Sequence, residues 1–104
     1  MKSEALIQSE IMIALSNGGC KVFRANAGRA YSKTGNPIKL FPPGFPDLCG
    51  WRVSDGRFFA IEVKNVKGTL SDDQKKFRAM AKKQKILYGV ARSVEDALGI
   101  VGRE

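Results

Sequence analysis

Apolar residues near the N-terminus recur at the spacing of one helix face. The stripe falls at i, i+4, i+5 and i+8 and consists of Ile7, Ile11, Met12 and Leu15. Residues at these positions lie on one side of a helix with 3.6 residues per turn. Ser3 has a side chain suited to capping such a helix, and Asn17-Gly18-Gly19 is typical of a helix end. The pattern therefore predicts a helix over residues 3–15.

Two apolar runs in the middle of the chain are separated by turn residues. The runs cover Asp47–Val53 and Arg57–Val63, with Ser54-Asp55-Gly56 between them. An Asp-Gly pair between apolar runs is a strong signal for a hairpin of two antiparallel strands. A shorter run, Lys21–Arg24, predicts an earlier strand. Residues 25–46 are rich in Gly, Pro, Asn and Ser and predict a long loop, of the kind that is functional or disordered.

The C-terminal third alternates between helix and strand signals. Ser71 and Gln74 have the spacing of a capping box, which predicts a helix that continues to about Lys85. Ile86–Ala91 reads as a strand, and Ser93–Leu98 as a capped short helix. The element order is thus α-β-β-β-α-β-α. It predicts an α/β fold in one domain over residues 1–104, with a mixed central sheet of about four strands flanked by helices. The β-α-β segment predicts a parallel strand pair joined by a right-handed crossover.

Composition narrows the classes of function. The chain has 104 residues, a formal net charge of +8, two cysteines and no histidine. Two cysteines without a CxxC pair and without histidine argue against a zinc site, and the lack of histidine excludes Ser-His and Cys-His catalysis. No apolar stretch is long enough to span a bilayer, and the N-terminus is too acidic for a signal peptide, so we expect a cytoplasmic protein without a membrane partner. The basic excess favours binding to nucleic acid through its phosphates.

Acidic residues and a lysine stand at the ends of the two central runs. Asp47 opens the first run, and Glu62 and Lys64 close the second. A hairpin would bring Asp47 close to Glu62, and the strand period of two puts Glu62 and Lys64 on one face, with Val63 opposite. A carboxylate near the end of a buried strand is costly unless it is paired or binds a metal. Two carboxylates and an ammonium group suit a hard divalent cation and an attacking water.

These motifs resemble a known nuclease family. Pro46-Asp47, Glu62-Val63-Lys64 and the element order resemble the PD-(D/E)xK nuclease superfamily with its restriction-endonuclease-like core, α-β-β-β-α-β. The VRR-NUC branch is the closer match. Its pattern is similar to three segments that together extend the resemblance over most of the chain: Arg24-x-Asn26-x-Gly28, Pro43-Gly44-x-Pro46-Asp47 and Gly68-x-Leu70-Ser71-x-x-Gln74.

The resemblance implies an activity and a set of residues. Stand-alone proteins of this branch and size are typical of phages, which would place this one in the host cytoplasm. It implies a homodimeric, structure-selective DNA endonuclease that hydrolyses phosphodiester bonds with Mg²⁺ or Mn²⁺, similar to Holliday-junction resolvases. Asp47, Glu62 and the backbone carbonyl of Val63 would bind the metal, and Lys64 would orient or help to deprotonate the attacking water. Arg24, Asn26 and Lys67 are candidate DNA contacts.

Three alternatives stay open at this point. The superfamily usually places an acid on the first helix, and here the position is taken either by Glu4 or by Gln8. Gln74 closes the capping box of its helix, and the resemblance implies that it also reaches the active site; both can hold in part, although one side chain cannot fully do both. A non-catalytic basic module that binds nucleic acid would also explain the net charge of +8.

Overall fold

Four strands form the central sheet of the computed structural model, which describes residues 1–28 and 30–104. They are β1 (Cys20–Arg24), β4 (Leu48–Arg52), β5 (Phe58–Val63) and β6 (Leu87–Ala91), and their order across the sheet is β1-β4-β5-β6. β1 pairs with β4 and β4 with β5 in antiparallel fashion, whereas β6 runs parallel to β5. The predicted hairpin, the mixed sheet and the parallel pair are therefore confirmed.

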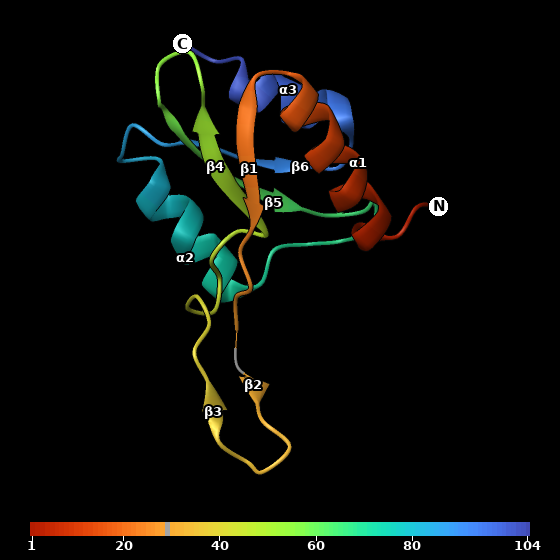
Figure 1. Ribbon diagram of the computed structural model, residues 1–104, viewed down its shortest axis with the longest axis vertical. Coiled ribbons are helices and arrows are strands. Elements are labelled where there is room, and N and C mark those ends of the chain that lie inside the picture. Colours follow the sequence, from red (N-terminus) through yellow and green to blue (C-terminus); the bar gives the residue numbers. More distant parts are fainter. Residues whose placement is uncertain (29) are drawn as a thin grey trace.

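Within the described part of the chain, three helices flank the sheet (Figure 1). They are α1 (Glu4–Asn17), α2 (Asp72–Ala81) and α3 (Val94–Val101), and Figure 1 shows α1 and α3 side by side and away from α2. Ser3, Ser71 and Ser93 cap the three helices, because each hydroxyl accepts a backbone N–H bond inside the first turn. Among the residues that the structure describes, no helix is both long and apolar enough to cross a membrane.

The hydrophobic core lies between the sheet and the pair α1 and α3. Strand alternation directs Phe59, Ile61 and Val63 of β5 into this core, where they join Ile11 and Leu15 of α1. Glu62 lies on the other face of the same strand and is also buried, at 2% exposure. The sheet thus separates an apolar layer from a layer that contains the acidic group.

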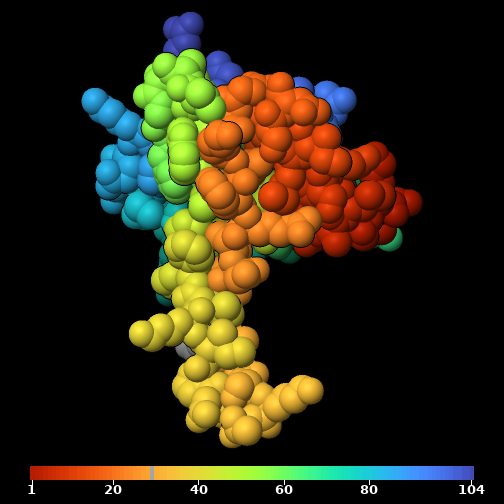
Figure 2. Space-filling model, viewed as in Figure 1, coloured from red at the N-terminus to blue at the C-terminus, as the bar shows by residue number. Residues whose placement is uncertain are grey.

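A small hairpin projects from the body of the molecule. It consists of β2 (Ala30–Tyr31) and β3 (Pro37–Ile38), which pair in antiparallel fashion, and Figures 1 and 2 show it extending away from the sheet. Residues 25–46 were expected to form a loop without strands. Two-residue strands are too short to produce an alternation signal, although the turn residues Gly35 and Asn36 between them were a local indication.

Two helix ends differ from the prediction. α2 stops at Ala81 rather than near Lys85, because the amides of Lys83 and Gln84, just past the C-cap Lys82, bond to carbonyls only three residues back. Such bonds form a tight turn instead of continuing the helix. α3 continues beyond Leu98 to Val101, since the buried Ile100 and Val101 outweigh the low helix propensity of glycine.

Candidate active site

The β4–β5 hairpin brings Asp47 against the end of β5. The ladder between the two strands ends at the pair Leu48 and Ile61, so Asp47 lies level with Glu62. Beyond that pair the N–H of Val63 has no backbone partner on β4, and Asp47 Oδ2 accepts its hydrogen bond at 2.7 Å. A buried amide needs an acceptor, and this contact also fixes the orientation of the Asp47 carboxylate.

Glu62 is the centre of the acidic group. Its carboxylate is buried on the α2 side of the sheet, where Gln74 Nε2 donates a hydrogen bond of 3.1 Å to Oε1. Lys64 Nζ lies 4.0 Å from the same oxygen, and the Lys64 side chain is only 12% exposed. The predicted convergence of Asp47, Glu62 and Lys64 is therefore present in the fold, with Val63 on the opposite, apolar side.

Burial and a neighbouring acid change the protonation of Glu62. Removal from water is the largest cause that raises the pKa of this carboxyl to about 9, followed by a side-chain hydrogen bond with Asp47 and the charge of Asp47. Lys64 lowers this pKa and Glu4 raises it further, both as smaller effects. Without a bound cation, this raised pKa favours the protonated form of Glu62 at neutral pH.

The side-chain amide of Gln74 makes two hydrogen bonds, one through its oxygen and one through its nitrogen. Its Oε1 accepts a hydrogen bond from the Ser71 N–H at 2.8 Å, which completes the capping box of α2. Its Nε2 donates to Glu62. The prediction that one side chain cannot fully make both contacts is therefore wrong, because the amide oxygen makes one and the amide nitrogen makes the other. The start of α2 is thereby tied to the acidic group.

A proline- and glycine-rich segment joins Asp47 to the same helix. Gly44 has a positive φ of 89°, and a Cβ at this position would lie 2.5 Å from the backbone carbonyl oxygen of Asp73. Only glycine permits both the conformation and this close approach. The segment that ends in the buried Pro46 thus lies directly against the first turn of α2, which positions Asp47 relative to Gln74.

The structure places Glu4 beside the loop that follows β5. Glu4 Oε2 accepts a long hydrogen bond from the Asn65 N–H at 3.4 Å, and a Cβ on Gly68 would meet this oxygen at 2.8 Å and the Lys64 chain at 3.0 Å. Gly68 therefore allows Glu4 and Lys64 to approach one another. Gln8 is half-buried one turn further along α1. A metal-binding role for either residue stays a prediction.

The loop after β5 is held from the other side by an arginine. Arg92 Nη1 donates to the backbone oxygens of Asn65 at 2.5 Å and Gly68 at 2.8 Å. This residue follows β6, and sequence reasoning missed it because nothing in its local pattern distinguishes it from other basic residues. Its contacts fix the backbone on which Lys64 and Lys67 stand.

The chemistry of the donor set suits a hard divalent cation. The available groups are carboxylate oxygens of Asp47 and Glu62, and Mg²⁺ and Mn²⁺ prefer oxygen ligands. Within residues 1–28 and 30–104, no group of three or more Asp, Glu, Cys or His side chains is close enough to hold a metal ion. Two carboxylates therefore fit the ion only together with other oxygens, such as backbone carbonyls or water.

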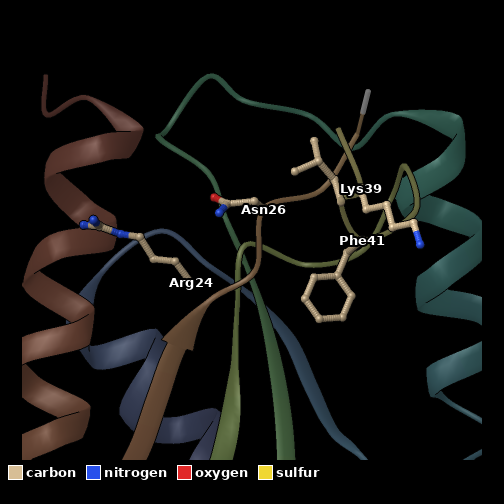
Figure 3. Close-up of a pocket in the computed structure, with 5 residues that line it drawn as sticks. Arg24, Asn26, Lys39 and Phe41 are labelled. Carbon is tan, nitrogen blue, oxygen red and sulfur yellow. The ribbon is translucent and has the colours of Figure 1, made fainter. Parts of the chain in front are cut away.

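The residues predicted to contact DNA lie in two separate parts of the structure. Arg24 and Asn26 line one pocket together with Lys39, Leu40 and Phe41 (Figure 3). Arg24 Nη2 also donates to Ser9 Oγ of α1 at 3.1 Å. Lys67 is exposed on the loop after β5. Lys39 and Phe41 were not singled out from the sequence as site residues, because only the tertiary fold brings them next to Arg24.

Comparison with known families decides the classification. A family model described as the VRR-NUC domain matches residues 8–95. The chain belongs to the VRR-NUC domain family. No curated protein sequence matches it.

Membership of this family agrees with the structure. The VRR-NUC domain is a nuclease domain, and the mixed four-stranded sheet flanked by helices is a restriction-endonuclease-like fold. Nucleases of this kind typically use divalent metal ions. The match includes both the segment with Asp47 and the segment with Glu62, Lys64 and Gln74.

Proposed function

We propose that this VRR-NUC protein is an endonuclease that hydrolyses DNA phosphodiester bonds with Mg²⁺ or Mn²⁺ and prefers branched DNA, such as a Holliday junction. The observation that carries the proposal is the buried Glu62, which meets Asp47 and Lys64 at the end of the β4–β5 hairpin. A buried acid whose pKa is raised by its removal from water and by a neighbouring carboxylate is characteristic of a functional site. The formal net charge of +8 supports a polyanionic substrate.

Each residue has a distinct part in the proposed reaction. Asp47, Glu62 and the Val63 carbonyl would hold the cation, which supplies Lewis-acid activation of water and stabilises charge on the phosphate. Lys64 donates hydrogen bonds to the attacking water or to a phosphate oxygen and balances negative charge. Gln74 orients the Glu62 carboxylate through Nε2. Arg24, Asn26 and Lys67 are proposed to contact the DNA backbone.

Cleavage of a panel of labelled DNAs tests this function against the alternative of a non-catalytic module. We expect branched substrates to be cut in Mn²⁺ or Mg²⁺ and none to be cut in EDTA, because two carboxylates cannot activate water without the ion. A binding module would retard the same DNAs equally in Mn²⁺ and in EDTA and would leave every strand intact. That result would reject the enzyme.

The protein is expected to act as a homodimer on junctions. Two scissions at a four-way junction need two active sites, and two-fold dimers are the commonest way to relate them. Light scattering at micromolar concentration is expected to show twice the mass of the chain, and an immobile junction is expected to be cut in paired strands. A monomer that cuts linear duplex as readily as junctions would contradict this prediction but would leave the metal site unaffected.

A further inference from the structure

A basic and aromatic pocket lies where the projecting hairpin joins the sheet. It has a volume of about 360 Å³, and its lining consists of Arg24, Asn26, Lys39, Leu40 and Phe41. The backbone holds its two walls together, since the Phe41 N–H donates to the Asn26 carbonyl at 2.9 Å and the Gly28 N–H donates to the Phe41 carbonyl at 3.0 Å. The pocket is therefore a built part of the fold and not an accident of side-chain placement.

The aromatic ring of Phe41 is held in position with part of its surface free. It stacks on Phe45, with ring centroids 4.4 Å apart and planes inclined by 18°, and Phe45 in turn makes a T-shaped contact with Phe77 on α2, with centroids 5.2 Å apart. Phe41 nevertheless keeps 46% of its surface exposed. Because Phe45 covers one face of the ring, the exposed area lies on the remaining face and edge. A fixed, exposed ring of this kind suits the stacking of a nucleobase.

Cations flank the ring, and the segment that carries Lys39 and Phe41 contains no acidic residue. Figure 3 shows Arg24 and Lys39 reaching to opposite sides of the pocket, with Asn26 between them. Residues 25–46 contain no Asp or Glu. A DNA strand that crosses the pocket would thus meet a positive group on either side, where its phosphates lie, and an amide and an aromatic ring in between.

The pocket adjoins the candidate active site through one residue. Ala25, between Arg24 and Asn26, donates its N–H to the backbone carbonyl of Asp47 at 2.9 Å. A nucleotide in the pocket would therefore lie close to a phosphate at Asp47. A base inside a duplex is stacked on both neighbours and cannot also stack on a protein ring, whereas an unpaired base can.

We propose that this pocket binds one unpaired nucleotide of a DNA strand beside the scissile phosphate, with its base on Phe41 and its flanking phosphates near Arg24 and Lys39. The inference rests on the proposed DNA substrate and adds the feature by which the protein recognises it. A flap, a splayed end or a junction with opened central base pairs presents such a nucleotide, whereas an intact blunt duplex does not. Preference for branched DNA would then arise in part from Phe41.

Equilibrium binding in EDTA tests the pocket separately from cleavage. We expect Phe41→Ala to weaken binding of a single-stranded oligonucleotide by roughly 5- to 100-fold, the range of one base–aromatic stack, and to change blunt-duplex binding less than about twofold. Phe41→Tyr keeps the ring and is expected to bind single strands like the wild type. Phe41→Leu keeps the apolar volume but loses the ring, and is expected to bind single strands as weakly as Phe41→Ala. The matched control is Phe58→Ala, which removes a similarly exposed ring (39%) at the other end of β5 and should leave both affinities unchanged.

A fluorescent base gives a direct signature of stacking. An oligonucleotide with 2-aminopurine is expected to lose fluorescence when the wild-type protein binds, and to keep it with Phe41→Leu at saturating protein. Equal weakening of single-stranded and duplex binding by Phe41→Ala, or no weakening, would overturn the inference. A change of oligomeric state without a change in single-strand affinity would assign the ring to a protein contact and would also overturn it.

The same measurements distinguish this inference from the proposed function. If Phe41 selects single strands but no DNA is cut in Mn²⁺, the pocket stands and the nuclease proposal fails. If DNA is cut and Phe41→Leu matches the wild type in every assay, the nuclease stands and the pocket fails. Absence of any DNA binding would reject both.

Discussion

Asp47→Asn is expected to abolish metal-dependent DNA cleavage while the fold stays intact. Asparagine keeps an oxygen that can accept the Val63 N–H, now bonded to Asp47 Oδ2 at 2.7 Å, but it removes the charge that would bind the cation. Loss of several kcal/mol of transition-state stabilisation corresponds to a rate lower by about 10³-fold or more. Asp47→Ala is the less informative variant, because it also leaves a buried amide without a partner, at a cost of about 1–3 kcal/mol.

Lys64→Ala is expected to reduce cleavage in the same assay, because it removes the ammonium group 4.0 Å from Glu62. Single-turnover cleavage of a labelled junction in Mn²⁺ measures both variants, and thermal unfolding confirms that each is folded. Glu95→Gln, which removes an exposed carboxylate on α3, is the control and should cleave like the wild type. If Asp47→Asn cleaved within about threefold of the wild-type rate, its proposed role in metal binding would be wrong.

The free energy of unfolding in EDTA is expected to fall as the pH rises from about 5 to 9. The folded pKa of Glu62 is about 9 and its ordinary value is 4.5, so the folded protein binds one more proton than the unfolded chain between these values. The contribution of that proton to the free energy of unfolding is fully present below pH 4.5 and is lost as the pH rises through 9. Between these values the free energy of unfolding falls by at most about 1.4 kcal/mol per pH unit. Glu62→Gln has no titrating group at position 62 and is expected to have a larger free energy of unfolding than the wild type at pH 8.

Urea unfolding at several pH values in EDTA measures this difference, with Glu95→Gln as the control that should retain the wild-type slope. Mn²⁺ is expected to stabilise the wild-type protein more at pH 8 than at pH 6, because the ion competes with the proton on Glu62. The same addition should have little effect on Glu62→Gln. Parallel stability curves for wild type and Glu62→Gln would show that the carboxyl group is ionised in the fold, contrary to its buried environment.

Local signals were sufficient to predict most of the elements. The Asp55-Gly56 turn between two apolar runs predicted the β4–β5 hairpin, and serine caps marked the starts of the helices. The ends of α2 and α3 were predicted less well, because packing and tight turns decide where a helix stops. The β2–β3 hairpin was missed, since two-residue strands carry no periodicity.

Part of the candidate site could also be predicted, because local sequence signals determine it. The strand period of two places Glu62 and Lys64 on one face, and the hairpin turn determines that Asp47 lies across from Glu62. Both relations are local in sequence. The roles of Arg92 and Phe41 depend on segments that meet only after folding, so no spacing in the chain indicated them.

The sequence by itself determined the family, the order of the helices and of the central-sheet strands, and the three residues that meet at the end of β5, because short-range periodicity and turn chemistry depend on neighbouring residues. Only the tertiary structure decided that Glu62 is buried with a raised pKa, that Gln74 caps α2 and bonds to Glu62 at once, and that Phe41 and Arg24 share a pocket. These properties depend on desolvation and on contacts between distant segments, which arise when the sheet and its helices pack together.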